Sequence, residues 1–240
     1  MLPYLEARSD VRLYSRMIRI FGKGESSLTY ELRDIIEHQT NPTVAPYVKT
    51  GEVTLRVTAL CQNEAEGEAL ADPMIRTILE RVGDVVYSTT GESLPETCAR
   101  LLTDDHLTLA LAESCTGGLL ASELVAIPGC SKFLLEGCVA YSDDAKMRRL
   151  GVKPETLMQF SAVSEACARE MAEGVRAASG ASYALATTGY AGPDGGTEED
   201  PVGTVYIALA SAAGTQIKRI RLFGERARIR EIACLHAFDL

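Results

Sequence analysis

Strand-like and helix-like patterns alternate along the second part of the chain, and this alternation restricts the possible folds more than any other sequence feature. The predicted strands are Leu107–Ala112, Cys138–Tyr141, Tyr183–Thr187, Gly203–Ala210 and Gln216–Phe223, and the predicted helices pass through Cys98 and Leu102, follow the glycines at 117 and 118, or begin at Asp143, Ser164 and Glu225. Alternation of this kind predicts a sheet with helices on both faces. The last two strands follow each other directly, which indicates a mixed sheet.

A smaller α+β unit precedes this part. Its predicted elements are a strand over Val11–Phe21, a helix over Ser26–Gln39, a strand over Glu52–Cys61, a helix over Glu64–Val82 with a kink near Pro73, and a short strand over Val85–Ser88. The stretch from Thr89 to Ser93 has the composition of a linker. We therefore predict a small α+β domain over residues 1–90 and a three-layer α/β/α domain with a mixed sheet over residues 95–240.

Composition limits the class of protein. The 240 residues are 46% hydrophobic and 24% charged, as in ordinary soluble globular proteins. No apolar run approaches the roughly 18 residues that a membrane span needs, and Met1–Tyr4 does not begin a signal peptide. These features predict a cytoplasmic protein with no membrane partner.

Cysteine usage and net charge argue against several kinds of site. The seven cysteines are scattered and never spaced Cys-x-x-Cys, so we expect neither a disulfide framework nor a metal site, and no cofactor. The net charge of −9 argues against a nucleic-acid partner, because binding of nucleic acid needs a cationic face.

The segment Ala112-Glu-Ser-Cys-Thr-Gly-Gly118 joins an apolar strand to a helix and contains two candidate nucleophiles, Ser114 and Cys115. The backbone N–H groups of Thr116, Gly117 and Gly118 would lie near the helix N-terminus, where they could hold an anion or a developing oxyanion. The local pattern alone favours a simpler role, in which Ser114 or Thr116 caps the helix.

A nucleophilic serine needs a base. The three histidines, His38, His106 and His236, lie in no recognisable motif, so a Ser-His-Asp triad has no positive support. Lys146, in Ala140-Tyr-Ser-Asp-Asp-Ala-Lys146, is the alternative if burial or neighbouring cations lower its pKa. The spacing from Tyr141 is one residue longer than in short-chain dehydrogenases, and no Gly-x-Gly-x-x-Gly fingerprint occurs, which disfavours dehydrogenase chemistry.

Several motifs in a fixed order carry a family resemblance. AESCTGG, VAYSDDAK, GVKPETL, SAVSE, TGYAGPDGG, PVGTV and GERARIR resemble the C-terminal domain of the CinA family, the nicotinamide-nucleotide amidohydrolases, over about residues 95–240. RIFGKGESSL and the stretch NPTVAPYVKTGEVTLRVTA resemble the KH-like segment that precedes this domain in longer CinA proteins, whose amino-terminal nucleotide-binding domain has no counterpart in this sequence. The Gly22-Lys23-Gly24 turn lacks the Gly-x-x-Gly loop of RNA-binding KH modules, so we expect a packing or dimerisation module.

The resemblance implies hydrolysis of the carboxamide of nicotinamide mononucleotide to nicotinate mononucleotide and ammonia. It implies that Ser114 is the nucleophile and that Tyr141 and Lys146 activate it. The positions that it implies for substrate binding are Thr116, Gly117, Gly118, Thr188, Gly189, Gly192, Arg226 and Arg230. It further implies a pyridine nucleotide as partner and a homo-oligomer, in the simplest case a dimer.

Several alternatives remain open at this point. Cys115 is the second candidate nucleophile, although strand alternation would point it away from Ser114. The cations at positions 218, 219, 221, 226, 228 and 230 form either an anion site or a solvated face. Asp200 makes the loop before PVGTV acidic and would repel a phosphate if that loop bordered the site. The alternative function is a non-catalytic oligomeric scaffold or a pyridine-nucleotide sensor linked to competence and DNA damage.

Overall fold

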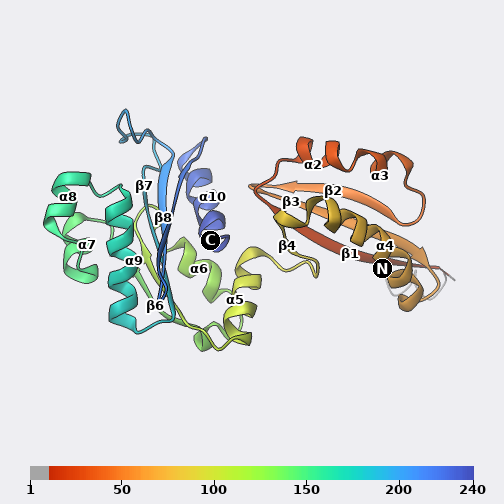
Figure 1. Ribbon diagram of the computed structural model, residues 1–240, viewed down its shortest axis with the longest axis horizontal. Helices are drawn as coiled ribbons and strands as arrows, with labels where there is room; N and C mark the ends of the chain where they lie inside the picture. The colour runs from red at the N-terminus through yellow and green to blue at the C-terminus, as the bar shows by residue number, and fades with distance from the viewer. Residues whose placement is uncertain (1–10) are drawn as a thin grey trace. The chain divides into compact units, whose positions relative to one another are not determined.

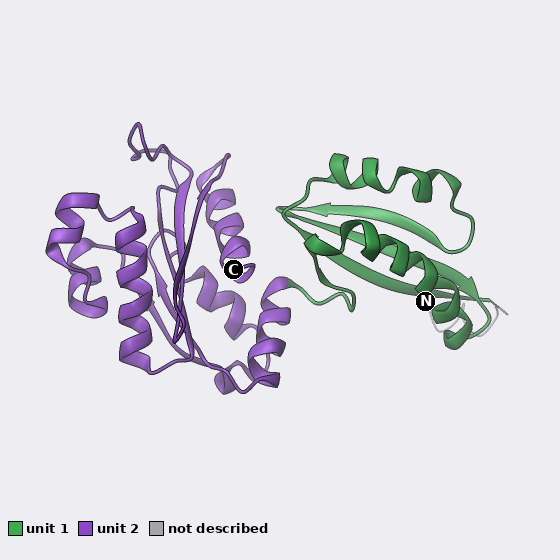
Figure 2. Cartoon of the chain, viewed as in Figure 1, with its two compact units in different colours: residues 1–93 green, residues 94–240 purple. Residues whose placement is uncertain are grey.

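A computed structural model describes residues 11–240, and the chain divides into two compact units, residues 1–93 and residues 94–240 (Figure 2). The predictions made for Met1–Tyr4 lie outside the described residues. Within residues 11–240, no helix combines the length and the apolar character needed to cross a bilayer.

The first unit is a four-stranded antiparallel sheet in the order β2-β3-β1-β4 with helices packed against it (Figure 1). Its elements are β1 (Arg12–Phe21), α2 (Glu25–Glu31), α3 (Arg33–His38), β2 (Thr43–Lys49), β3 (Glu52–Cys61), α4 (Glu64–Val82), a short 3-10 helix (Gly83–Val85) and β4 (Val86–Ser88). Alternate residues of β3, Val53, Leu55 and Val57, are buried in one core with Ile75 and Ile78 of α4. This alternation is the pattern that predicted the strand.

Two details of the first unit differ from the sequence-based expectations. Strand β2 was not predicted, because Pro46 interrupts its pattern; an edge strand tolerates proline, since its outer side needs no ladder hydrogen bond. The single helix expected over Ser26–Gln39 is two helices, interrupted at the buried Leu32. Helix α4 has the predicted bounds and includes Pro73, so the kink expected there stays a prediction.

The second unit is built on a five-stranded mixed sheet in the order β6-β5-β7-β8-β9, parallel from β6 to β7 and antiparallel from β7 to β9. Its elements are α5 (Leu94–Asp104), β5 (Leu109–Glu113), α6 (Leu119–Val125), a 3-10 turn (Cys130–Lys132), β6 (Leu134–Val139), α7 (Asp143–Leu150), α8 (Pro154–Phe160), α9 (Glu165–Ser179), β7 (Tyr183–Gly189), β8 (Thr204–Ser211), β9 (Gly214–Arg221) and α10 (Arg226–Phe238). Helix α9 with α7 and α8 covers one face, and α5, α6 and α10 cover the other (Figure 1). The predicted three-layer α/β/α architecture with a mixed sheet is confirmed.

Two elements of this unit differ from the prediction by more than a shift of one or two residues at an end. Strand β6 lies earlier than the predicted Cys138–Tyr141, because it is an edge strand in which Glu136 and Gly137 weaken the apolar pattern. Helix α8 was not predicted as a separate element, although Pro154 at its first turn is a typical helix-start signal.

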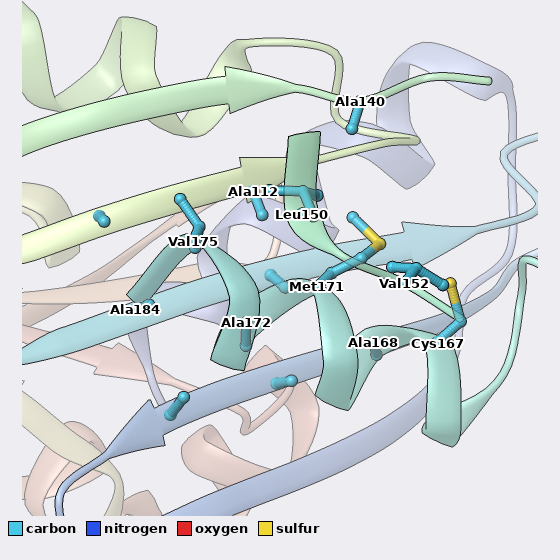
Figure 3. Close-up of a cluster of buried hydrophobic side chains, with 14 of the residues drawn as sticks. Ala112, Ala140, Leu150, Val152, Cys167, Ala168, Met171, Ala172, Val175 and Ala184 are labelled. Atoms are coloured by element: carbon cyan, nitrogen blue, oxygen red, sulfur yellow. The ribbon is translucent and has the colours of Figure 1, made fainter. Parts of the chain in front are cut away.

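Small side chains allow α9 to approach the sheet closely. The strand positions that face α9 are alanines, among them Ala112 and Ala184, which pack against Met171, Ala172 and Val175 of the helix (Figure 3). The opposite face of β5 carries leucines, so the alternation along one strand separates the two helical layers. Because α7 packs on α9, this core also determines where α7 lies relative to the end of β5.

Candidate active site

A serine and a buried lysine meet where β5 ends. Ser114 directly follows β5, and Lys146 lies on α7; Lys146 Nζ is 3.1 Å from Ser114 Oγ. The lysine side chain is only 1% exposed. Its Nζ also donates hydrogen bonds, each 3.0 Å long, to the backbone carbonyl oxygens of Ala140 and Tyr141. The structure therefore brings together the predicted nucleophile and its predicted base.

The buried surroundings of Lys146 favour the loss of its proton more than water does. Burial lowers the pKa of Lys146 below its usual value, and the neighbouring Cys167 and Asp143 oppose this effect without cancelling it. The three oxygens around Nζ match the three N–H donors of the ammonium form, and Nζ donates to Ser114 Oγ in this arrangement. After loss of one proton, Nζ keeps two N–H donors for the carbonyl oxygens and has a lone pair for the Ser114 hydroxyl, which is the geometry required of a general base.

A pocket of about 180 Å³ opens beside this pair. Its lining includes Ser114, Cys115, Tyr141, Asp143, Lys146, Ala162, Val163, Thr188, Gly189, Tyr190, Ala191 and Arg226. No histidine is among the described residues that line it, and Lys146 is the lining residue whose side chain has a hydrogen bond to Ser114 Oγ. The carboxyl ends of parallel strands are where open α/β sheets place their ligands, and this pocket follows that rule.

Tyr141 contributes through two different atoms. Its backbone carbonyl accepts from Lys146, and its hydroxyl accepts a hydrogen bond of 3.0 Å from Arg226 Nη2. Arg226 also donates to the carbonyl oxygen of Gly192 over 2.8 Å. The tyrosine ring is 61% exposed and lies at the outer part of the pocket. Its predicted role as an activating partner of Ser114 remains a prediction.

The other residues predicted to bind the substrate lie at different positions relative to the pocket. Thr188 and Gly189, at the end of β7, line the pocket, and Thr188 Oγ1 donates to the Ala162 carbonyl oxygen over 2.7 Å. Gly192 reaches the site through its carbonyl contact with Arg226. Thr116 is fully buried, with its hydroxyl 2.7 Å from that of Thr187.

Two corrections concern the turn from Ser114 to Gly118. Neither Ser114 nor Thr116 caps α6; Gly118 is the N-cap residue and provides no side-chain cap. Two of the three N–H groups expected to hold an anion are occupied, because Gly117 N donates to the Ser114 carbonyl oxygen and Gly118 N donates to Glu113 Oε2. The protein's own groups therefore use the two glycine donors that the sequence suggested for an oxyanion.

The six cations near the C-terminus do not act as one group. Lys218 and Arg219 form ion pairs with Asp239 and Asp200, respectively, each 2.9 Å long. Arg226 lines the pocket, whereas Arg230 donates to the carbonyl oxygens of Cys115 and Thr116 over 3.2 and 2.6 Å.

The acidic loop is tied to the outer strands. Besides its ion pair with Arg219, Asp200 accepts a hydrogen bond of 3.0 Å from the Tyr206 hydroxyl. It is not among the residues that line the pocket, so its charge is paired on β8 and β9.

Cys115 also lines the pocket, so strand alternation does not remove it from the site. Burial raises the pKa of its thiol to about 11. The thiol is therefore protonated near neutral pH and is a poor nucleophile, whereas Ser114 has a base in contact.

Sequence reasoning missed Glu113. This residue ends β5 and is 1% exposed, and its carboxylate accepts hydrogen bonds from the backbone N–H groups of Gly118, Leu120 and Ala121. The available signal was a carboxylate at the end of a fully apolar strand, because a buried charge requires several hydrogen-bond partners.

Comparison with known proteins supports the reading of the motifs. Residues 91–240 match the family described as the CinA C-terminal domain, and residues 15–88 match the damage-inducible protein CinA KH domain. The chain belongs to the CinA family. The site described above lies entirely within the CinA C-terminal domain.

Individual relatives agree with this assignment. A CinA-like protein of Kosmotoga olearia is 46% identical over 99% of this chain, and the chain spans 58% of the length of that relative. The solved structure of competence damage-inducible protein A from Klebsiella pneumoniae is 42% identical, covers 61% of this chain and 91% of its own, and superposes with a TM-score of 0.59. A competence/damage-inducible protein of Agrobacterium tumefaciens is 40% identical over 62% of this chain and 93% of its own, with a TM-score of 0.58.

Proposed function

We propose that this CinA protein hydrolyses the carboxamide of nicotinamide mononucleotide, releasing ammonia and nicotinate mononucleotide. The observation that carries the proposal is the contact of 3.1 Å between Ser114 Oγ and the Nζ of Lys146, an amine that is 1% exposed and has a lowered pKa. A serine activated by a neutral lysine is a known solution to amide cleavage.

The proposed reaction has two halves. Lys146 Nζ takes the proton of Ser114 as Oγ bonds to the carboxamide carbon; the resulting ammonium then gives that proton to the departing amino group, and ammonia leaves. A nicotinoyl ester on Ser114 remains. In the second half a water molecule attacks the ester, Lys146 takes a proton from it and returns the proton to Ser114, and the carboxylic acid is released. The sum is amide plus water giving acid plus ammonia.

The size and charge of the pocket favour a pyridine nucleotide. A cavity of about 150 Å³ accommodates one benzene ring, so the 180 Å³ pocket suits a pyridine carboxamide with the ribose and phosphate directed outward. The Asp143 carboxylate lines the pocket and complements the positive charge of the pyridinium ring. Arg226 uses only part of its five-donor guanidinium on protein atoms, which leaves donors for a phosphate.

The test is ammonia release from nicotinamide mononucleotide by the protein and by two adjacent variants. Ser114→Ala should lower kcat by roughly 10⁴- to 10⁶-fold, because it removes the nucleophile. Cys115→Ala is the matched control and should retain most of the activity, because the thiol that it removes is protonated. Mass spectrometry of a quenched reaction should show the nicotinoyl ester on the wild-type protein and not on Ser114→Ala.

Two results would count against the proposal. An inactive Cys115→Ala together with an active Ser114→Ala would reverse the choice of nucleophile. Saturable binding of the nucleotide without ammonia release would support the alternative of a pyridine-nucleotide sensor.

A further inference from the structure

The turn that follows Ser114 is held by two charged side chains from opposite ends of the domain sequence. On one side, the Glu113 carboxylate accepts from Gly118 N, Leu120 N and Ala121 N over 2.8, 3.2 and 2.9 Å. On the other, the Arg230 guanidinium of α10 donates to the carbonyl oxygens of the two residues after Ser114. The carboxylate thus accepts from backbone N–H groups at the end of the turn and the start of α6, and the guanidinium donates to backbone carbonyl groups within the turn.

Glu113 is a buried acidic residue, and its carboxylate needs hydrogen-bond partners at this position. Its side chain is 1% exposed, and burial of an unpaired carboxylate is strongly unfavourable. Its three backbone donors all come from the start of α6, so the carboxylate satisfies N–H groups that the helix itself leaves unpaired. The carboxylate therefore fixes α6 relative to the end of β5.

Arg230 fits the turn closely. Its Nε lies 3.2 Å from the Cys115 carbonyl oxygen and its Nη2 lies 2.6 Å from that of Thr116. The planar guanidinium spans two acceptors at once, which a lysine ammonium cannot do with the same orientation. Gly117 has a φ of +62°, and a Cβ there would lie 3.5 Å from Arg230 Nη2, so the guanidinium lies directly against the turn.

These contacts complete the restraints on Ser114. The strand already holds its backbone, because Ser114 N donates to the Thr187 carbonyl oxygen over 2.9 Å. The next two carbonyl groups are held by Arg230. Reacting groups tolerate displacements of only about 0.5 Å, so the orientation of Oγ toward Lys146 depends on how firmly this turn is held.

We propose that Glu113 and Arg230 are positioning residues that hold the turn so that Ser114 Oγ stays aligned with Lys146 Nζ. This role rests on the proposed function, and it replaces phosphate binding as the role of Arg230. Within residues 11–240, the two hydrogen bonds that Arg230 donates go to backbone carbonyls, and Arg230 is not among the residues that line the pocket. Arg226, one helical turn away, is the arginine that faces the pocket.

The test compares Arg230→Ala with Arg228→Ala, a matched control on the same helix. We expect Arg230→Ala to lower kcat for nicotinamide mononucleotide by about 10- to 100-fold with little change in KM, because misplacement of a nucleophile affects the chemical step. Methylguanidinium added to the solution should restore activity, since it supplies the same planar donors. Methylammonium should not, and Arg228→Ala should resemble wild type.

A second measurement needs no pyridine nucleotide. A fluorophosphonate reacts with an activated serine: an Oγ–P bond forms, fluoride leaves and the hydroxyl proton passes to the base. Mass spectrometry gives the rate of Ser114 modification. Glu113→Gln, which keeps the shape of the side chain but replaces one accepting oxygen by a donor, should slow this rate by about 10-fold or more, as should Arg230→Ala. If wild type is labelled but inactive on the nucleotide, the proposed function fails, while labelling still tests the positioning role.

Three outcomes would overturn the positioning role. The first is an increase in KM with unchanged kcat in Arg230→Ala, which would make this arginine a substrate ligand. The second is a lowered melting temperature with no recovery in methylguanidinium, which would make it a structural residue. The third is Ser114 labelling at the wild-type rate in Glu113→Gln.

Discussion

Lys146 is a buried amine whose protonation state determines when the site can work. Its pKa is lowered mainly by burial, since the side chain is 1% exposed. Only the neutral form accepts the Ser114 proton, so we expect kcat/KM to rise with pH as Lys146 loses its proton. The free energy of unfolding should also rise with pH. This rise is expected between the pKa of Lys146 in the folded protein and its value of about 10.4 in the unfolded chain, because in that pH range the unfolded chain binds a proton that the folded protein does not.

A pH profile of ammonia release measures this effect. Lys146→Arg keeps a cation that stays charged at these pH values, so it should lose nearly all activity. In Lys146→Met, the free energy of unfolding measured by chemical denaturation should no longer show the rise with pH that Lys146 causes. Near-normal turnover of Lys146→Arg would remove lysine from the mechanism.

Arg226 should contribute to binding through the phosphate. Arg226→Ala should weaken binding of nicotinamide mononucleotide by roughly 10- to 150-fold, the usual value of a charge-assisted contact. Nicotinamide riboside, which has no phosphate, should lose little further affinity. Calorimetry with both compounds makes the comparison, and equal losses for the two would show that Arg226 supports the pocket through Tyr141 and Gly192 instead.

At the level of elements, the position of α7 depends on a glycine in α9. A Cβ at Gly174 would collide with the backbone carbonyl of Leu150, the last residue of α7. Because α7 carries Lys146, the close approach of these two helices helps to place the base. Glycine is ordinarily unfavourable inside a helix, so its presence here has a packing reason.

Gly174→Ala should therefore destabilise the protein, by about 1 to 3 kcal/mol, although alanine is the better helix former. Gly83→Ala is the control: Gly83 has right-handed helical dihedral angles, and the nearest atom to an added Cβ is 3.9 Å away. That variant should be neutral or gain up to about 1 kcal/mol. Urea unfolding distinguishes them, and a stabilised Gly174→Ala would show that α7 and α9 separate without cost.

At the level of the whole molecule, each unit has a core of its own. The first core contains residues such as Ile18 and Leu55, and the second is built around α9 and includes Met171. All the site residues described above belong to the second unit. The match to the solved Klebsiella chain covers 61% of this chain and 91% of that chain.

We expect residues 94–240, produced alone, to fold and to release ammonia from nicotinamide mononucleotide at a rate close to that of the full chain. Circular dichroism and the ammonia assay measure the two properties. A folded but inactive fragment would show that residues 1–93 contribute to the site or to an assembly that the site requires.

The sequence by itself determined the elements with strong periodicity and the local motifs. β3 and α4 have the predicted bounds, because their apolar patterns are regular over ten and nineteen residues. Ser114 and Lys146 could be named because each lies in a short ordered motif. The edge strands β2 and β6 were missed or displaced, since an edge strand needs less apolar alternation.

Only the tertiary structure decided which partner each charged side chain of the site contacts. Arg226 and Arg230 lie four residues apart in one motif, yet one lines the pocket and the other binds the turn. Glu113 and Arg230 meet the same turn from the beginning and the end of the domain sequence. Local pattern specifies helix and strand, because the interactions that form them are local. The partner of a charged side chain depends on how distant elements pack, and no window of sequence contains that information.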